Sequence, residues 1–178
     1  MDLRTERTRQ SIKQAFFELR KQKPLEKISV KELAELAYIN KATFYTHYHD
    51  IFDLADQLEN EFFDSVLKNA QYMDCLVTNP SIAVQELTRE LAANRATSDI
   101  LFSGSRQGYY SQKLNLALRK VLDARYPERI HDLQWNIILT ILIQGCYHAF
   151  QTCSTKDNVA DVSRIIGEIN QYLIDEFL

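Results

Sequence analysis

The sequence predicts an all-α protein of about nine helices, and two observations support this fold class. Glycine and proline are scarce, with 4 and 3 residues in a chain of 178. An all-β sandwich or barrel needs many tight turns, and those turns require Gly, Pro or Asn at set positions. Apolar residues also recur at the three- and four-residue spacing of one helical face along most of the chain. We therefore expect long helices and no sheet.

Four helices are expected in the first seventy residues, and the last three have start signals of their own. The first covers about residues 4–20. The second begins at a capping box, in which Ser29 is followed three residues later by Glu32. Asn40 is placed to cap the third helix, and Asp50 the fourth, which runs into the 70s.

The remaining helices are expected to follow the prolines and the apolar periodicity. Helical segments are predicted at about 82–95, 97–104 and 105–126. Another begins at Pro127, which is tolerated at a first helical position, and reaches Ser154. The last covers about 157–177, with an apolar face made of Val159, Val162, Ile166, Ile169 and Leu173.

The charge is distributed unevenly along the chain. Residues 1–50 carry ten Lys or Arg and seven Asp or Glu, a net charge of +3, whereas residues 51–178 have a net charge of −6. A basic N-terminal part on an acidic body is typical of nucleic-acid binders, although a solvated amphipathic helix gives the same excess. The same alternatives apply to Arg4, Arg7 and Arg9, which either contact DNA or simply begin a solvated helix.

The cysteines and the apolar segments exclude several other classes. The three cysteines are odd in number and form no CxxC pair, so we expect no disulfide, no metal site, no cofactor and a cytoplasmic location. The polar N-terminal segment predicts no secretory signal peptide. The most apolar run, residues 133–150, contains Gln134, Asn136, Gln144 and His148, which favours a buried helix over a membrane span. No HExxH, GxSxG or phosphate-binding loop is present, so we expect a protein that is not an enzyme.

Residues 29–37 and 41–48 have the pattern of a helix-turn-helix, in which the second helix enters the major groove of DNA. Phe44 and Tyr48, four residues apart, should face inward with Ile39. The outward set is short, hydrogen-bonding and without a carboxylate from Lys41 to His49. Such side chains can contact base edges, thymine methyl groups and phosphates, and Lys41 adds charge that releases counterions.

These residues resemble the DNA-binding domain of the TetR/AcrR family of transcriptional regulators. The resemblance covers about residues 4–58, and the run Thr43-Phe44-Tyr45-Thr46-His47-Tyr48 is its most specific part. It implies a DNA-binding domain at 1–49 and a helical regulatory domain at 50–178. It also implies a DNA-contacting set that consists of Ser29, Val30, Lys31, Lys41, Ala42, Thr43, Tyr45, Thr46, His47 and His49. Two residues depart from the family pattern: Tyr38 stands where a turn glycine is usual, and Ile51 where a phosphate-contacting lysine is frequent.

The resemblance further implies a homodimer that binds double-stranded DNA, and a small-molecule effector of unknown identity. Candidate pocket residues are Phe102, Tyr109, Tyr110, Leu114, Trp135, Leu139, Gln144, Tyr147 and His148. Candidate dimer residues are Gly145, Ala149, Ile166, Gly167, Ile169 and Leu173. The polar stripe of Gln144, His148 and Gln151 suits a ligand, a dimer seam or a paired core network.

The function that follows is a ligand-responsive repressor that binds a palindromic operator as a homodimer, in the cytoplasm and without a membrane partner. The alternative is a helical co-activator or adaptor that acts mainly through protein contacts and binds DNA weakly.

Overall fold

The computed structural model describes residues 3–69, 75–155 and 157–177, and the regular secondary structure of these residues is entirely helical, with nine α-helices and no strand. The predicted all-α fold class is therefore confirmed. The expected continuation of the fourth helix into the 70s falls on residues 70–74, outside the described residues.

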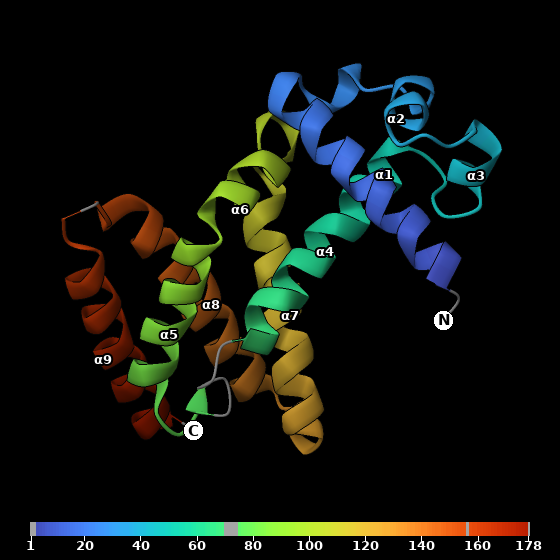
Figure 1. Ribbon diagram of the computed structural model, residues 1–178. Helices are drawn as coiled ribbons and strands as arrows, with labels where there is room; N and C mark the ends of the chain where they lie inside the picture. The colour runs from blue at the N-terminus through green and yellow to red at the C-terminus, as the bar shows by residue number, and fades with distance from the viewer. Residues whose placement is uncertain (1–2, 70–74, 156, 178) are drawn as a thin grey trace. The chain divides into compact units, whose positions relative to one another are not determined.

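Helices α2, α3 and α4 begin where the cap signals predict. Figure 1 shows the four N-terminal helices. They are α1 (Leu3–Gln22), α2 (Val30–Leu36), α3 (Lys41–Tyr45) and α4 (Ile51–Asn69). Ser29 Oγ accepts a hydrogen bond from the Glu32 amide at 3.2 Å, and Asp50 accepts one from the Asp53 amide at 2.8 Å. Half of the predicted capping box is absent, because the Glu32 carboxylate accepts from Lys23 Nζ at 2.5 and 2.6 Å.

The later helices are α5 (Pro80–Ala93), α6 (Arg95–Leu101), α7 (Tyr109–Arg125), α8 (Leu133–Cys153) and α9 (Val159–Phe177). The predicted helix start at Pro127 is wrong for α8. Pro127–Arg129 forms a separate 3-10 turn, and α8 begins only at Leu133. The cap of α8 is Asp132, whose Oδ1 accepts a hydrogen bond from the Trp135 amide at 3.2 Å. A better cap, and not the proline, determines where α8 starts.

The chain divides into two compact units. Unit 1 contains the chain up to Phe62 together with Ala96–Tyr110, and unit 2 contains Phe63–Arg95 and the chain from Ser111 onward. Helices α4 and α7 each continue from one unit into the other. The compact unit that holds α1 to α3 thus also includes the first part of α4 and all of α6 except its first residue, Arg95.

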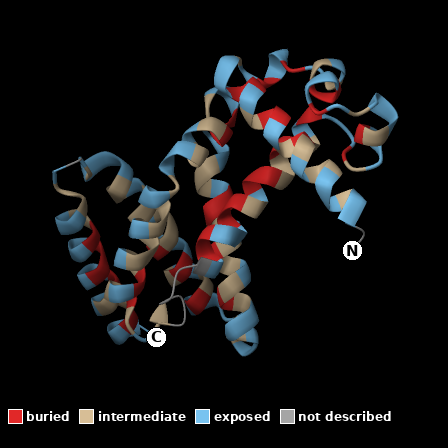
Figure 2. Ribbon diagram, viewed as in Figure 1, coloured by how far each residue is buried: buried red, intermediate tan, exposed pale blue. Residues whose placement is uncertain are grey.

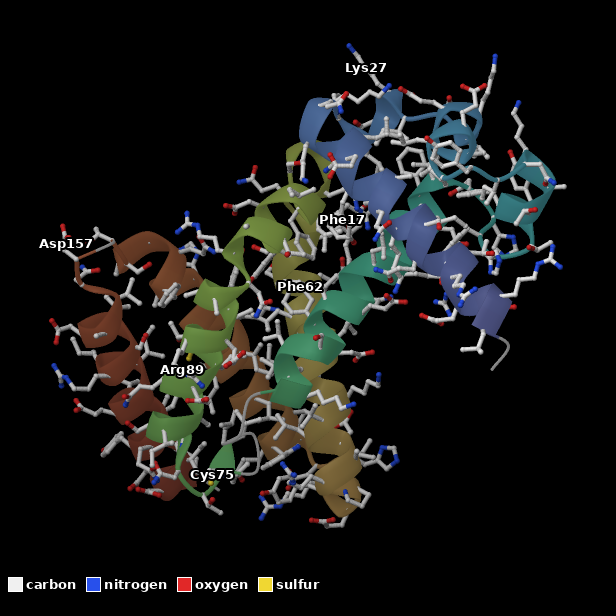
Figure 3. The ribbon with its side chains drawn as sticks, in the orientation of Figure 1. Phe17, Lys27, Phe62, Cys75, Arg89 and Asp157 are labelled. Carbon is white, nitrogen blue, oxygen red and sulfur yellow. The ribbon has the colours of Figure 1, made fainter. Side chains whose placement is uncertain are left out.

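Unit 1 has an apolar core crossed by buried charges. Phe62 of α4 packs edge-on against Phe102, with ring centroids 6.1 Å apart (Figure 3). Arg20 of α1 is buried and donates to the carbonyl oxygens of Ile100 and Ser103 at 3.0 and 3.3 Å, which caps the end of α6. The sequence of α1 alone does not predict this burial, because the carbonyl partners of Arg20 lie in a distant part of the chain.

A buried ion pair joins α4 to the segment after α6. Arg106 donates from Nε and Nη2 to the two carboxylate oxygens of Glu59, at 2.6 and 2.5 Å. Glu59 is 0% exposed and Arg106 is 8% exposed. The Glu59 hydrogen bonds raise the pKa of Arg106 above its ordinary value, although desolvation opposes the shift.

In unit 2, α5 and α8 both pack against α9. The closest approach is at Gly167, where an added Cβ would lie 2.6 Å from Ser81 Cα. The buried stripe of α9 is therefore Ser163, Ile166, Gly167, Asn170 and Ile174, visible as red positions along the helix in Figure 2. Ile169, a member of the predicted apolar face of α9, is exposed in the protomer, whereas Gly167 packs against α5.

Helix α8 is buried on one face only, although its sequence is apolar on nearly all sides. Trp135, Leu139 and Leu142 are buried, whereas Leu133, Ile137 and Ile141 are exposed. Among the described helices, none combines the length and apolarity needed to cross a membrane. The three cysteines are free thiols, as expected, and Cys146 donates to Asn170 Oδ1 at 3.1 Å.

Candidate nucleic-acid interface

Helices α2 and α3 are joined by a tight turn built on a left-handed residue. The Ile39 amide donates to Ala34 O at 3.0 Å and the Tyr38 amide donates to Glu35 O at 3.2 Å. These two bonds form a Schellman motif, which requires a positive φ at the residue whose amide donates the second bond. That residue is Tyr38, with φ of 55°. The motif turns the chain so that α3 starts at Lys41, three residues after Tyr38.

Helix α3 is held in place by its cap and by an aromatic inner face. Asn40 Oδ1 accepts from the Thr43 amide at 2.7 Å and from Thr43 Oγ1 at 3.0 Å. Phe44 and Tyr48 are buried, as predicted, with ring centroids 5.6 Å apart. Helix α3 is shorter than the predicted 41–48, because residues 46–48 continue as turns whose amides donate to Ala42 O and Phe44 O.

The outer face of α3 presents the side chains that were predicted to face outward. Lys41, Ala42, Tyr45 and Thr46 are exposed, and Thr43 and His47 are half-buried. Tyr45 is 56% exposed although its ring packs edge-on against Phe44, with centroids 5.6 Å apart. This packing restricts an aromatic ring that is still more than half exposed to solvent.

The start of α2 and the start of α4 lie in the same unit. Ser29 and Lys31 are exposed and Val30 is half-buried. Lys31 Nζ lies 4.0 Å from Glu35, a weak surface pair that leaves the ammonium in solvent. His49 is exposed, and its amide donates to Asp53 Oδ2 at 2.8 Å. Ile51 is buried, which explains why an apolar residue occupies this position in the chain.

The predicted pocket residues are divided between the units. Phe102, Tyr109 and Tyr110 belong to unit 1, where Phe102 and Tyr110 pack edge-on with centroids 4.9 Å apart. The other six belong to unit 2, where Trp135 and Leu139 share a packed apolar cluster with Leu122. Trp135 and Leu139 are therefore core residues of unit 2.

The predicted polar stripe of α8 is not a buried network. His148 and Gln151 are exposed and Gln144 is half-buried. Burial raises the pKa of Tyr147, and its hydrogen bond with Gln151 opposes that shift. Unit 2 instead contains two buried polar atoms that have no hydrogen-bond partner in the described part of the chain, Trp135 Nε1 and Asn115 Oδ1. The sequence pattern gave no sign of Asn115, because a single Asn in a helix is ordinary.

The predicted dimer residues fall into two groups. Ile166 and Gly167 are buried within the protomer, and Ala149 and Leu173 are half-buried. Gly145 and Ile169 are exposed, and a Cβ at Gly145 would meet nothing within 4 Å. The contact made by Gly167 is thus with α5 of its own chain.

No group of three or more His, Cys, Asp or Glu side chains within residues 3–69, 75–155 and 157–177 is arranged to hold a metal ion. In comparisons with known proteins, no family model, curated protein or solved structure matches the chain.

Proposed function

We propose that this chain is a ligand-responsive transcriptional regulator of the TetR/AcrR type, which binds a palindromic DNA operator as a homodimer and represses transcription. The observation that carries the proposal is the outer face of α3. Between Lys41 and His49 this face offers an ammonium group, hydroxyls, an imidazole and a methyl group, and it contains no carboxylate. A helix of that composition on a rigid aromatic base can contact both base edges and phosphates.

A homodimer is part of the proposal because one short helix reads few bases. Two copies related by a two-fold axis read two half-sites about 34–36 Å apart or a multiple of that distance. Apolar faces on α8 and α9 support the dimer. Leu133, Ile137 and Ile141 are exposed at a spacing of four, and Ile165, Ile169 and Tyr172 are exposed on α9. Contiguous exposed apolar surface is characteristic of an interaction site.

The proposed effector site lies in unit 2. Trp135 Nε1 is a buried donor and Asn115 Oδ1 a buried acceptor, and each unpaired group costs about 1–3 kcal/mol. A small molecule that offers an acceptor to Trp135 Nε1, or a donor to Asn115 Oδ1, would remove that group's cost. Such a ligand changes operator affinity only if it binds the DNA-competent and the incompetent states unequally.

Removing polar groups from the outer face of α3 is expected to weaken DNA binding. The double variant Tyr45→Phe with His47→Ala loses two hydrogen-bonding groups. We therefore expect the dissociation constant for DNA to increase about ten- to hundredfold. The measurement is a mobility-shift titration at low and at high salt, with duplex DNA from upstream of the gene that encodes the chain.

A matched control is Tyr109→Phe with His131→Ala, which makes the same chemical changes at exposed positions away from α3. The control should bind as tightly as the parent chain. If the parent does not bind at low salt, or if the α3 variant binds unchanged, the chain acts through protein contacts and the DNA proposal fails.

Placing charge on the apolar face of α8 and α9 is expected to separate the dimer. Ile141→Asp with Ile169→Asp buries two unpaired carboxylates in the proposed interface, so the variant should sediment as a monomer at micromolar concentration. Leu116→Asp on α7 is the control, since Leu116 is 56% exposed and Ile141 is 57% exposed. A parent chain that is monomeric under these conditions contradicts the homodimer.

A further inference from the structure

Tyr38 has two features that the packing of unit 1 does not require: it is a non-glycine residue at a positive φ, and its aromatic ring lies in solvent. Its φ of 55° lies in the left-handed region, and its side chain is 96% exposed. A non-glycine residue in that conformation reduces the ratio of folded to unfolded chain by about five- to thirtyfold. The Schellman motif needs only a residue that tolerates positive φ, and Gly meets that need without strain.

Tyr38 is one of the residues that line a concave surface of unit 1. A concave surface of about 640 Å³ lies between the first part of α1 and the turn, and it is lined by Arg4, Arg7, Thr8, Ser11 and Tyr38 among other residues. Its polar lining is two arginines and hydroxyl groups, and none of its lining residues is a carboxylate. All of these residues lie in unit 1 with α3.

The concave surface is also next to the start of α3 in the chain. Tyr38 precedes Lys41, the first and exposed residue of that helix, by three positions. A duplex that α3 contacts through its major groove brings the flanking phosphates close to the start of that helix. Arginine, hydroxyl and tyrosine side chains are typical contacts of the phosphate and sugar backbone.

We propose that Tyr38 contacts the DNA backbone next to the half-site that α3 reads, with its hydroxyl donating to a phosphate oxygen and Arg7 contributing charge at the same concave surface. This inference rests on the proposed DNA-binding function and adds a positioning contact to it. The strain at Tyr38 lowers folding stability, and the contact of its side chain with DNA raises the affinity for the operator.

Tyr38→Gly tests the inference because its two expected effects have opposite signs. The folded-to-unfolded ratio should rise about two- to fivefold, since relief of strain is partly offset by the freedom of Gly in the unfolded chain. The dissociation constant for DNA should increase about tenfold, because a hydrogen bond to a charged group is lost. Tyr38→Phe should weaken binding by a similar factor and leave stability unchanged.

Two DNA probes identify the kind of contact: the upstream duplex and a random-sequence duplex of equal length. A backbone contact predicts the same fold-loss on both probes. Gly104→Ala is the control, because Gly104 has φ of +60° and an added Cβ would meet nothing within 4 Å. This control should lower stability and leave DNA binding unchanged.

The outcomes separate this inference from the proposed function. If the parent binds both probes and Tyr38→Gly binds as tightly as the parent, the Tyr38 contact is overturned and the DNA-binding function stands. A loss confined to the upstream duplex also overturns the backbone contact. If the parent binds neither probe at low salt, both proposals are overturned.

Discussion

Arg106→Ala is expected to destabilise the protein by about 3–5 kcal/mol, the typical effect of removing one partner of a buried ion pair. Glu59 is fully buried and accepts both of its short hydrogen bonds from Arg106. Without the guanidinium, that carboxylate is left charged and unpaired, or must take up a proton. The measurement is urea unfolding followed by circular dichroism, with the midpoint and slope compared between variants.

The sign of the pH dependence follows from the raised pKa of Arg106. A base with a raised folded-state pKa contributes stability that is fully present below its unfolded-state pKa and is lost only as pH rises through the higher value. The contribution of Arg106 is therefore present at neutral pH. The matched control is Lys120→Ala, which breaks the exposed pair with Asp64 and should cost less than about 1 kcal/mol.

Pairing the two substitutions distinguishes charge from packing. Arg106→Met with Glu59→Leu removes both charges and keeps similar volume, so it should be more stable than Arg106→Ala. If Arg106→Ala costs no more than Lys120→Ala, the buried pair does not hold the segment after α6 to α4.

Gly167→Ala is expected to destabilise unit 2 by about 1–3 kcal/mol, the usual effect of overpacking a tight contact. The added Cβ would lie 2.6 Å from Ser81 Cα, which belongs to the backbone of α5 and cannot rotate away. The helices must separate, and contacts along the α5–α9 interface are lost. Thermal unfolding of the chain reports the change.

Gly145→Ala provides the opposite expectation in a neighbouring helix. A Cβ at Gly145 meets nothing of its own protomer within 4 Å, so in the monomeric Ile141→Asp, Ile169→Asp background the substitution should raise stability by about 1 kcal/mol through helix propensity. Equal effects of the two substitutions would show that the close approach at Gly167 does not control stability.

The helices could be predicted from the sequence because their signals are local. Ser29, Asn40 and Asp50 each accept the amide hydrogen bond that their cap positions predict. The inner face of α3 was predictable for the same reason, since Phe44 and Tyr48 are one helical turn apart and both are apolar enough to be buried. The predicted start of α8 at Pro127 was wrong because Asp132, a stronger cap, lies five residues further along the chain.

The outer face of α3 was also predictable, since the side chains opposite a buried aromatic pair must face away from it.

The proposed effector site could not be predicted from the sequence. Trp135 and Leu139 are core residues, and the buried unpaired atoms at Asn115 and Trp135 depend on which helices surround them.

The sequence by itself determined the all-α fold class, the cap positions and the two faces of α3, because each depends on residues within one or two turns of a helix. Only the tertiary structure decided which charged residues are buried and which face of α9 is covered. Arg20, Glu59 and Arg106 look like surface residues until distant segments supply their partners. The small residues Ser163 and Gly167 are covered instead of Ile169, because close packing against α5 depends on the shape of both helices and not on hydrophobicity alone.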